Sequence, residues 1–190
     1  TYSLFYIMTA FAQAYSRTSA TLSEAGYPMG LGIPANTFTG LLLMSAIVFA
    51  IFISISGLYA DKIGRRKWLI WTTVSILIFA LCMPLFLGNG TPTSVFAFLV
   101  IGMALMGMTF GPMATLLPEL FPTEVRYSGA SLAYNIASII GATIAAMISL
   151  KINALYGLMG VGIYLAINAF LTLLALLASK ETKNVDLTQI

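Results

Sequence analysis

Long apolar stretches follow one another along almost the whole chain, and six of them are long enough for a helix to cross a bilayer. A hydrocarbon core of about 30 Å needs roughly 20 residues of helix. Strands are not plausible at these lengths because a spanning strand takes only about ten residues. The sequence therefore predicts an all-α, polytopic transmembrane bundle with spans at residues 2–22, 38–59, 68–87, 94–117, 130–150 and 158–178.

The composition supports a bilayer environment and argues against a soluble protein. The chain has 190 residues, of which 59% are hydrophobic and only 8% are charged, and its mean hydropathy is +0.97. The net charge of +3 does not indicate nucleic acid, because the basic residues lie in loops beside apolar spans. We therefore expect the lipid bilayer as a partner and no nucleic acid.

The residue types that support most catalytic and metal chemistry are scarce. Histidine is absent, and the single cysteine, Cys82, lies inside an apolar span. No Ser-His, Asp-Asp or His-x-x-x-His set is present to activate a nucleophile or water. The sequence predicts no metal site, no cofactor and no enzymatic activity.

A short charged loop at residues 57–67 separates the second and third spans and sets the expected topology. Such a loop cannot lie in hydrocarbon, and its excess of Lys and Arg marks the cytoplasmic face. The even number of spans brings both ends of the chain to that same face of the cell membrane. The count gives Lys151 alone on the opposite face, against Lys62, Arg65, Arg66, Lys67, Arg126, Lys180 and Lys183.

The first and fourth spans are the least regular ones and occupy equivalent positions when the six are divided into two triplets. Such a pattern is typical of secondary transporters built from inverted repeats. Gly107-x-x-x-Gly111 in the fourth span predicts close approach to a neighbouring helix. The chain starts at Thr1 without a methionine or a signal peptide. We interpret it as part of a longer protein, with a six-helix domain at residues 1–178 and a cytoplasmic tail at 179–190.

Two loops and the tail carry a family resemblance. The first loop matches G-x-x-x-D-[RK]-x-G-R-[RK], and the second is the segment at residues 117–131, Leu-Pro-Glu-Leu-Phe-Pro-Thr-Glu-Val-Arg-Tyr-Ser-Gly-Ala-Ser. The tail contains Glu181-Thr182-Lys183. The chain thereby resembles the major facilitator superfamily. The matching residues of the first loop are Gly57, Asp61, Lys62, Gly64, Arg65 and Arg66.

The resemblance implies helices seven to twelve of a twelve-helix transporter whose N-terminal six-helix half is missing from this chain. It is closest to the metabolite:proton symporter and sugar-porter-like families, although Ala142-Thr143 follows Gly141 where further glycines are expected. Known members of the symporter family carry small organic acids, zwitterions and related metabolites together with protons. We therefore expect a small-molecule substrate and protons as partners.

Asp61 is expected to take part in a gating network at the charged loop. A carboxylate at the C-terminal end of a helix is disfavoured by the helix dipole and needs a compensating partner. The amides at the start of the fifth span are one candidate partner. The resemblance also implies salt bridges from Arg65 or Arg66 to Glu119, with Arg126 in the same network. The alternative is that these charges, with Gly57 and Gly64, only fix topology and form the turn.

Candidate substrate-binding residues lie in the first and fifth spans. Gln13, Arg17, Thr21 and Glu24 recur at helical spacing, so one face of a helix is expected to gather them. A guanidinium at position 17 is suited to a substrate carboxylate, but it is equally suited to lipid headgroups at the end of the span. In the fifth span, the stripe that includes Tyr134 and Asn135 indicates either helix packing or a pocket.

The predicted function is a secondary active transporter that moves a small organic acid or zwitterion by alternating access, with proton coupling. Glu24 is the one candidate coupling acid near a span, so the coupling carboxylate is expected in the missing half. The alternatives are a sugar or drug-type facilitator or exporter of the same fold, and a membrane sensor that binds without transporting.

Overall fold

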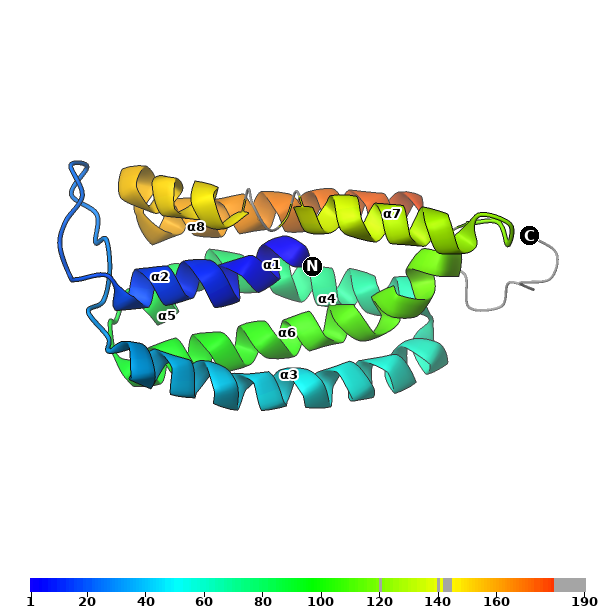
Figure 1. The fold of residues 1–190 in the computed structure, drawn as a ribbon, viewed down its shortest axis with the longest axis horizontal. Helices are drawn as coiled ribbons and strands as arrows, with labels where there is room; N and C mark the ends of the chain where they lie inside the picture. Colours follow the sequence, from blue (N-terminus) through cyan, green and yellow to red (C-terminus); the bar gives the residue numbers. More distant parts are fainter. Residues whose placement is uncertain (120, 140, 142–144, 180–190) are drawn as a thin grey trace.

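The computed structural model describes residues 1–119, 121–139, 141 and 145–179, which form antiparallel helices running along one long axis (Figure 1). These residues contain no strand, so the predicted all-α class is confirmed. The predicted Glu181-Thr182-Lys183 tail lies outside the described part. In chain order the elements are α1 Tyr2–Tyr6, η1 Ile7–Phe11, α2 Ala12–Arg17, α3 Ala35–Ile63, α4 Arg65–Leu81, α5 Met83–Leu87, α6 Pro92–Glu119, α7 Arg126–Ile139 and α8 Ala145–Ala178.

Three of the described helices are long and apolar enough to cross a membrane, namely α3, α6 and α8. The other predicted spans are divided. Between α4 and α5 the helix is interrupted at Cys82, two residues before Pro84, which lacks an amide hydrogen for the helical ladder. Helix α8 reverses at Gly157, which has φ 67°, so its two arms coincide with the end of the fifth predicted span and with the sixth.

The first span ends earlier than the sequence predicts, at Arg17 and not at residue 22. Thr18 is extended, with ψ 143°, and the chain then forms a loop at residues 18–34. The loop returns to the end of α2, where the amides of Leu31 and Ile33 donate to the carbonyls of Tyr15 and Ser16 at 3.1 and 2.8 Å. These bonds satisfy carbonyls that a longer helix would have paired internally.

This early ending contradicts one expectation about the predicted binding face. Thr21 and Glu24 lie in the loop, so they do not continue the face of α2 that carries Gln13 and Arg17. The prediction treated the spacing from Gln13 to Glu24 as helical throughout. It failed because the small polar run at 18–23 finds its hydrogen bonds in the loop and not in a helix.

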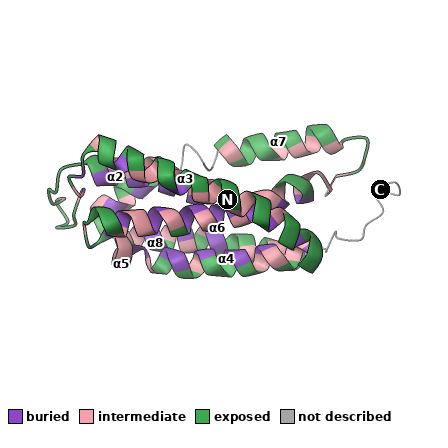
Figure 2. Ribbon diagram, turned by 90° about the horizontal axis from the view of Figure 1, so that it is seen from below, coloured by how far each residue is buried: buried purple, intermediate pink, exposed green. Residues whose placement is uncertain are grey.

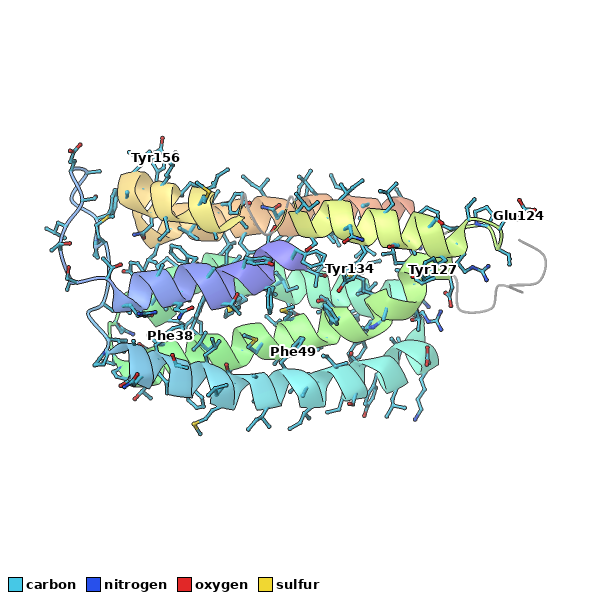
Figure 3. The ribbon with its side chains drawn as sticks, in the orientation of Figure 1. Phe38, Phe49, Glu124, Tyr127, Tyr134 and Tyr156 are labelled. Carbon is cyan, nitrogen blue, oxygen red and sulfur yellow. The ribbon has the colours of Figure 1, made fainter. Side chains whose placement is uncertain are left out.

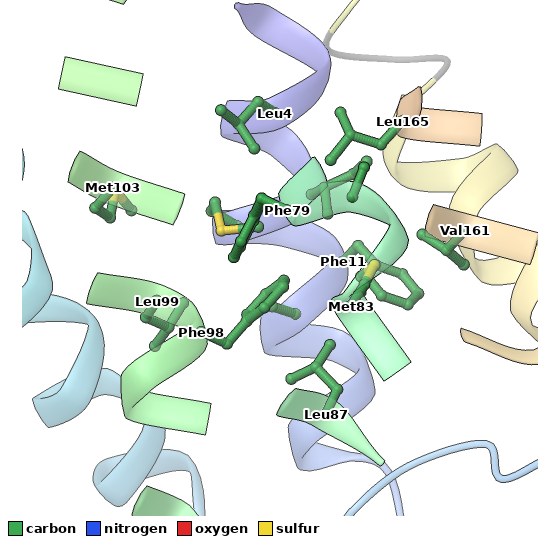
Figure 4. Packing of buried hydrophobic residues seen from close by; sticks show 14 of the residues in the cluster. Leu4, Phe11, Phe79, Met83, Leu87, Phe98, Leu99, Met103, Val161 and Leu165 are labelled. Atoms are coloured by element: carbon green, nitrogen blue, oxygen red, sulfur yellow. The ribbon is translucent and has the colours of Figure 1, made fainter. Parts of the chain in front are cut away.

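The core lies where α1, η1, α2, α4, α5, α6 and α8 converge (Figure 4). Phe79 stacks on Phe98 with ring centroids 5.1 Å apart, and Phe11 stacks on Tyr15 at 5.7 Å. Buried residues line the inward faces of these helices, whereas much of α3 and α7 is exposed (Figure 2). Large apolar side chains such as Ile47 and Trp71 are 62% and 76% exposed, as expected of surfaces that face lipid.

Helices α3 and α6 pack closely, as the Gly107-x-x-x-Gly111 spacing predicts. A Cβ atom on Gly107 would lie 2.7 Å from the carbonyl oxygen of Phe49, and one on Gly111 would lie 2.8 Å from that of Ile53. The Ser56 hydroxyl donates to the Gly107 carbonyl across the interface at 3.0 Å. Only glycine leaves room for this approach of the two backbones.

Candidate functional site

The charged loop forms a tight turn between α3 and α4 at one end of the bundle. Gly64 ends α3 and precedes α4 with φ 111°, a conformation that residues with a Cβ atom rarely adopt. The turn places Asp61 one helical turn before Arg65. Gly57 has open space at its own Cβ position, and its backbone nitrogen lies 3.1 Å from where a Cβ on Gly111 would be. Gly57 thus lies at the close contact of α3 with α6.

Arg65 connects three helices. Its Nε donates to Asp61 Oδ1 of α3 at 3.2 Å, and its Nη1 donates to Glu119 Oε1 of α6. The side chains of Arg65 and Glu119 are 17% and 14% exposed, whereas that of Asp61 is 64% exposed. The hydrogen bond and the charge of Glu119, with a smaller contribution from Asp61, raise the pKa of the Arg65 guanidinium above its ordinary value. Arg65 therefore stays charged at this junction.

The other two arginines of the predicted network bind elsewhere. The Arg66 guanidinium donates to the carbonyls of Leu176 and Leu177, at the C-terminal end of α8, at 2.8 and 2.7 Å. Arg126 donates to the Phe121 carbonyl and the Thr123 hydroxyl of its own loop, at 3.4 and 3.3 Å. Of the two partners that the sequence allowed for Glu119, the structure pairs it with Arg65.

The expected contact of Asp61 with the start of the fifth span is not among the hydrogen bonds of the described residues. Asp61 bonds to Arg65 within its own turn. Helix α7 begins at Arg126. A carboxylate at the C-terminal end of a helix needs a compensating partner, and Arg65 is that partner here. That the next helix, four residues later, supplies this partner was not predicted.

A groove of about 670 Å³ runs between α6 and α7 and contains two of the predicted binding residues. Tyr134 (Figure 3) and Asn135 line it from α7, and Arg126 lines it at the first residue of that helix. The Asn135 amide donates to the carbonyl of Ser131 in its own helix at 2.8 Å. Helix α7 has no buried residue, so its polar side chains remain accessible in this chain. The groove is lined by Met113, Ala114, Leu117, Pro118, Thr123, Arg126, Tyr127, Ala130, Ser131, Tyr134 and Asn135.

The other two predicted binding residues line a separate, shallow pocket of about 530 Å³ on α2. Gln13 and Arg17 are joined there by Ala10, Ala14 and Thr18. Arg17 is the last residue of α2 and is exposed. The start of α1 is the part of the first span that contacts the groove, through Tyr2 and Tyr134. A helical rise of about 1.5 Å per residue puts Arg17 roughly 20 Å along the axis from that contact. The four candidates therefore form two clusters and not one.

Tyr2 joins the first helix to the groove, although the sequence argument did not single it out. Its ring meets that of Tyr134 edge to face, with centroids 5.4 Å apart and an interplanar angle of 81°. Its hydroxyl is buried and makes no hydrogen bond of good geometry among the described residues. No sequence signal distinguished this role from that of the other tyrosines in the apolar spans.

The described residues contain no group of three His, Cys, Asp or Glu side chains that could hold a metal ion. The four acids in the described part are Glu24, Asp61, Glu119 and Glu124, and none of them lines the groove or the α2 pocket. The polar groups available to a ligand at these two sites are amides, hydroxyls and guanidinium groups. They are suited to binding and orienting a small molecule by hydrogen bonds and charge.

Known proteins resemble the chain over most of its length. It is 85% identical over 190 residues to a Haemophilus influenzae protein named as a metabolite transport protein, covering 100% of this chain and 43% of that relative. It is 51% identical over 189 residues to the inner membrane metabolite transport protein YhjE of Escherichia coli, covering 98% of this chain and 41% of YhjE. The chain thus spans less than half the length of these relatives.

More distant similarity reaches a protein with a stated cargo. The chain is 32% identical over 149 residues to the proline/betaine transporter of Salmonella typhimurium, covering 76% of this chain and 29% of that transporter. No solved structure matches the chain. The family model described as sugar (and other) transporter matches residues 29–190. The chain therefore belongs to the sugar (and other) transporter family of the major facilitator superfamily, a family of membrane transport proteins and not of enzymes.

Proposed function

We propose that this chain forms one six-helix half of a secondary active transporter of the cell membrane, which moves a small zwitterion or organic acid by alternating access. In this proposal a second six-helix half, outside this chain, faces α2 and α7. Helix α7 supports this because it has no buried residue and exposes both polar and apolar side chains. In this proposal the charged loop and the C-terminal end of α8 lie on the cytoplasmic face. The N-terminus lies midway along the bundle and not at that end, contrary to the expectation for both ends of the chain (Figure 1).

The groove between α6 and α7 is the observation that carries the proposal. It holds Tyr134 and Asn135 beside apolar residues of α6, which is the mixture typical of a small-molecule site. A quaternary or secondary ammonium group is attracted to the face of a tyrosine ring, and an amide orients a carboxylate. A zwitterion such as betaine or proline, the cargo named for one relative, fits both groups.

In the proposal, Gln13 and Arg17 bind the substrate at a second position along the same pathway. Their pocket lies toward the end of the bundle opposite the charged loop, so a small metabolite meets them before or after the groove and not at the same moment. A guanidinium attracts a carboxylate even when partly exposed. The alternative, that Arg17 binds lipid headgroups, predicts unchanged substrate affinity in Arg17→Lys.

The cluster of Asp61, Arg65 and Glu119 acts in the proposal as a latch on the cytoplasmic side. Arg65 ties α4 to α3 and α6, and the half-buried pair with Glu119 holds that end of the bundle together. Breaking these contacts is a step of opening toward the cytoplasm. Protons are the proposed coupling ion, with the coupling carboxylate in the half outside this chain, because neither ligand site holds an acid.

The test is uptake of radiolabelled glycine betaine or proline by full-length protein in liposomes, with and without an inward proton gradient. We expect saturable uptake that the gradient accelerates, and a loss of at least tenfold in kcat/KM in Tyr134→Leu, equivalent to about 1.4 kcal/mol. Tyr156→Leu is the matched control, because Tyr156 lies on α8 and is 64% exposed.

Each result bears on the proposal. Binding of betaine without uptake contradicts transport and supports the sensor alternative. Uptake that does not respond to the gradient contradicts only the proton-coupling part of the proposal and leaves transport itself supported. Equal losses in Tyr134→Leu and Tyr156→Leu contradict the groove as the binding site. Saturable uptake of a sugar with no affinity for betaine or proline replaces the zwitterion with the facilitator alternative.

A further inference from the structure

The loop at residues 18–34 has an ordered internal structure. It folds back on itself as a small hairpin, in which the amide of Ser23 donates to the Tyr27 carbonyl and that of Met29 donates to the Thr21 carbonyl, both at 2.8 Å. Gly26 provides the positive φ of 80° that the tip requires. The hairpin lies at the end of the bundle opposite the charged loop (Figure 1).

The base of the hairpin is fixed to the end of α2. The Gly32 amide donates to the Thr18 carbonyl at 2.8 Å, beside the bonds that Leu31 and Ile33 make to the last turn of the helix. Gly30 packs directly on the Thr18 backbone, where a side chain would not fit. The C-terminal carbonyls of α2 are thus capped by the hairpin itself.

The tip of the hairpin binds the reversal in α8. The Ser23 hydroxyl donates to the Ala154 carbonyl at 2.7 Å, and the Asn153 amide donates to the Pro28 carbonyl at 2.9 Å. The Tyr27 ring covers Gly157, and a Cβ on that glycine would lie 2.6 Å from the ring. The reversal at Gly157 ends a helical arm and leaves carbonyls without intrahelical partners, and Ser23 satisfies one of them.

We propose that this hairpin is a clasp that joins α2 to the reversal of α8 and makes the two move as one body. Residues that are more than a hundred positions apart in the chain are connected by two reciprocal hydrogen bonds and an aromatic contact. All of these groups are uncharged, so the clasp does not depend on pH or salt. In a protein that changes conformation, motion is then restricted to the helices outside this body.

The first test is hydrogen exchange of the full-length protein in lipid nanodiscs. We expect the amides of Met29, Leu31 and Ile33 to be protected, and to exchange roughly tenfold faster in Ser23→Ala/Asn153→Ala. The matched control is Ser75→Ala/Asn89→Ala, because both side chains bond only to carbonyls of the preceding helical turn. Fast exchange in the unmodified protein, or an unchanged rate in the clasp variant, overturns the proposal.

The second test measures distance and remains informative if the double variant is unstable. Spin labels at Glu24→Cys and Leu155→Cys, both exposed positions, report the gap across the clasp in a Cys82→Ser background. We expect one narrow distance distribution that broadens in Ser23→Ala alone. A broad or two-peaked distribution with Ser23 present overturns the clasp. Neither test uses transport, so failure of the clasp and failure of the proposed function are separate results.

Discussion

Arg65 on α4 donates to Glu119 on α6, and the same guanidinium lies 3.2 Å from Asp61 on α3. The two carboxylates differ in exposure, at 14% for Glu119 and 64% for Asp61. Removing one member of a charge pair that is shielded from water is costly, because the other charge is left without compensation. An exposed pair contributes little to stability. The two arms of this junction are therefore unequal, and the arm to Glu119 holds the helices together.

The first prediction concerns removal of the shared cation. Arg65→Ala leaves the Glu119 carboxylate half-buried without its partner, and we expect a loss of about 2 kcal/mol of stability. Asp61→Asn removes the exposed arm and is expected to cost about 0.5 kcal/mol. Thermal unfolding of the full-length protein in detergent measures both.

The double variant Arg65→Ala/Glu119→Gln completes this cycle. Because the neutral amide no longer needs a cation, we expect most of the stability lost in Arg65→Ala to return. Additive losses in the double variant would show that the two side chains act independently. Arg65 contributes no pH dependence of its own near neutral pH, because the stabilising effect of a base with a raised pKa is fully present below its unfolded pKa and is lost only at strongly alkaline pH.

The second prediction tests the close packing of α3 on α6. Gly107→Ala places a Cβ against the Phe49 carbonyl and Phe52, neither of which can move without displacing α3. We expect this variant to lose roughly 2 kcal/mol of folding stability, which a lower unfolding temperature would show. Gly40→Ala is the matched control on α3, because nothing lies within 4 Å of a Cβ atom at that position. Alanine has a better helix propensity than glycine, so we expect this variant to be as stable as the unmodified protein or more stable. Equal stability of the two variants would contradict the packing argument.

Much of the architecture was predictable because bilayer helices follow apolar length. The spans that became α3 and α6 were placed within a few residues, and the close glycine contact of α6 followed from spacing alone. The charged turn was predictable for a different reason. Gly64 and the bases around it leave few alternatives to a tight loop outside the hydrocarbon.

The remainder depended on tertiary contacts that spacing does not encode. The end of α2 at Arg17 is set by amides of the returning hairpin, so helical periodicity through Thr21 was a misleading signal. The assignment of Glu119 to Arg65, and of Arg66 to the end of α8, required knowing which helix ends meet. The polar character of the first and fifth spans predicted one shared pathway, whereas the fold separates their candidate binding residues into two sites.

The third prediction concerns the buried hydroxyl of Tyr2. Its oxygen makes no hydrogen bond of good geometry among the described residues, although the side chains of Tyr134 and Ser138 interact with it, so its desolvation is poorly compensated. Tyr2→Phe keeps the edge-to-face contact with Tyr134 and is expected to leave stability unchanged or raise it by up to about 1 kcal/mol. Tyr2→Ala also removes the ring and is expected to lower stability. A clear loss in Tyr2→Phe would show that the hydroxyl has a partner in the full-length protein.

The fourth prediction concerns Arg66, whose guanidinium reaches two successive carbonyls at the end of α8. A planar fork donates to both at once, whereas the ammonium group of lysine is a compact point charge that does not reproduce this geometry. We therefore expect Arg66→Lys to preserve expression and topology but to speed hydrogen exchange in the last turn of α8 several-fold. Lys67→Arg is the control, because Lys67 is exposed and next in sequence. If exchange in α8 is the same in both variants, charge alone holds the helix end, and the two-carbonyl contact is not what fixes it.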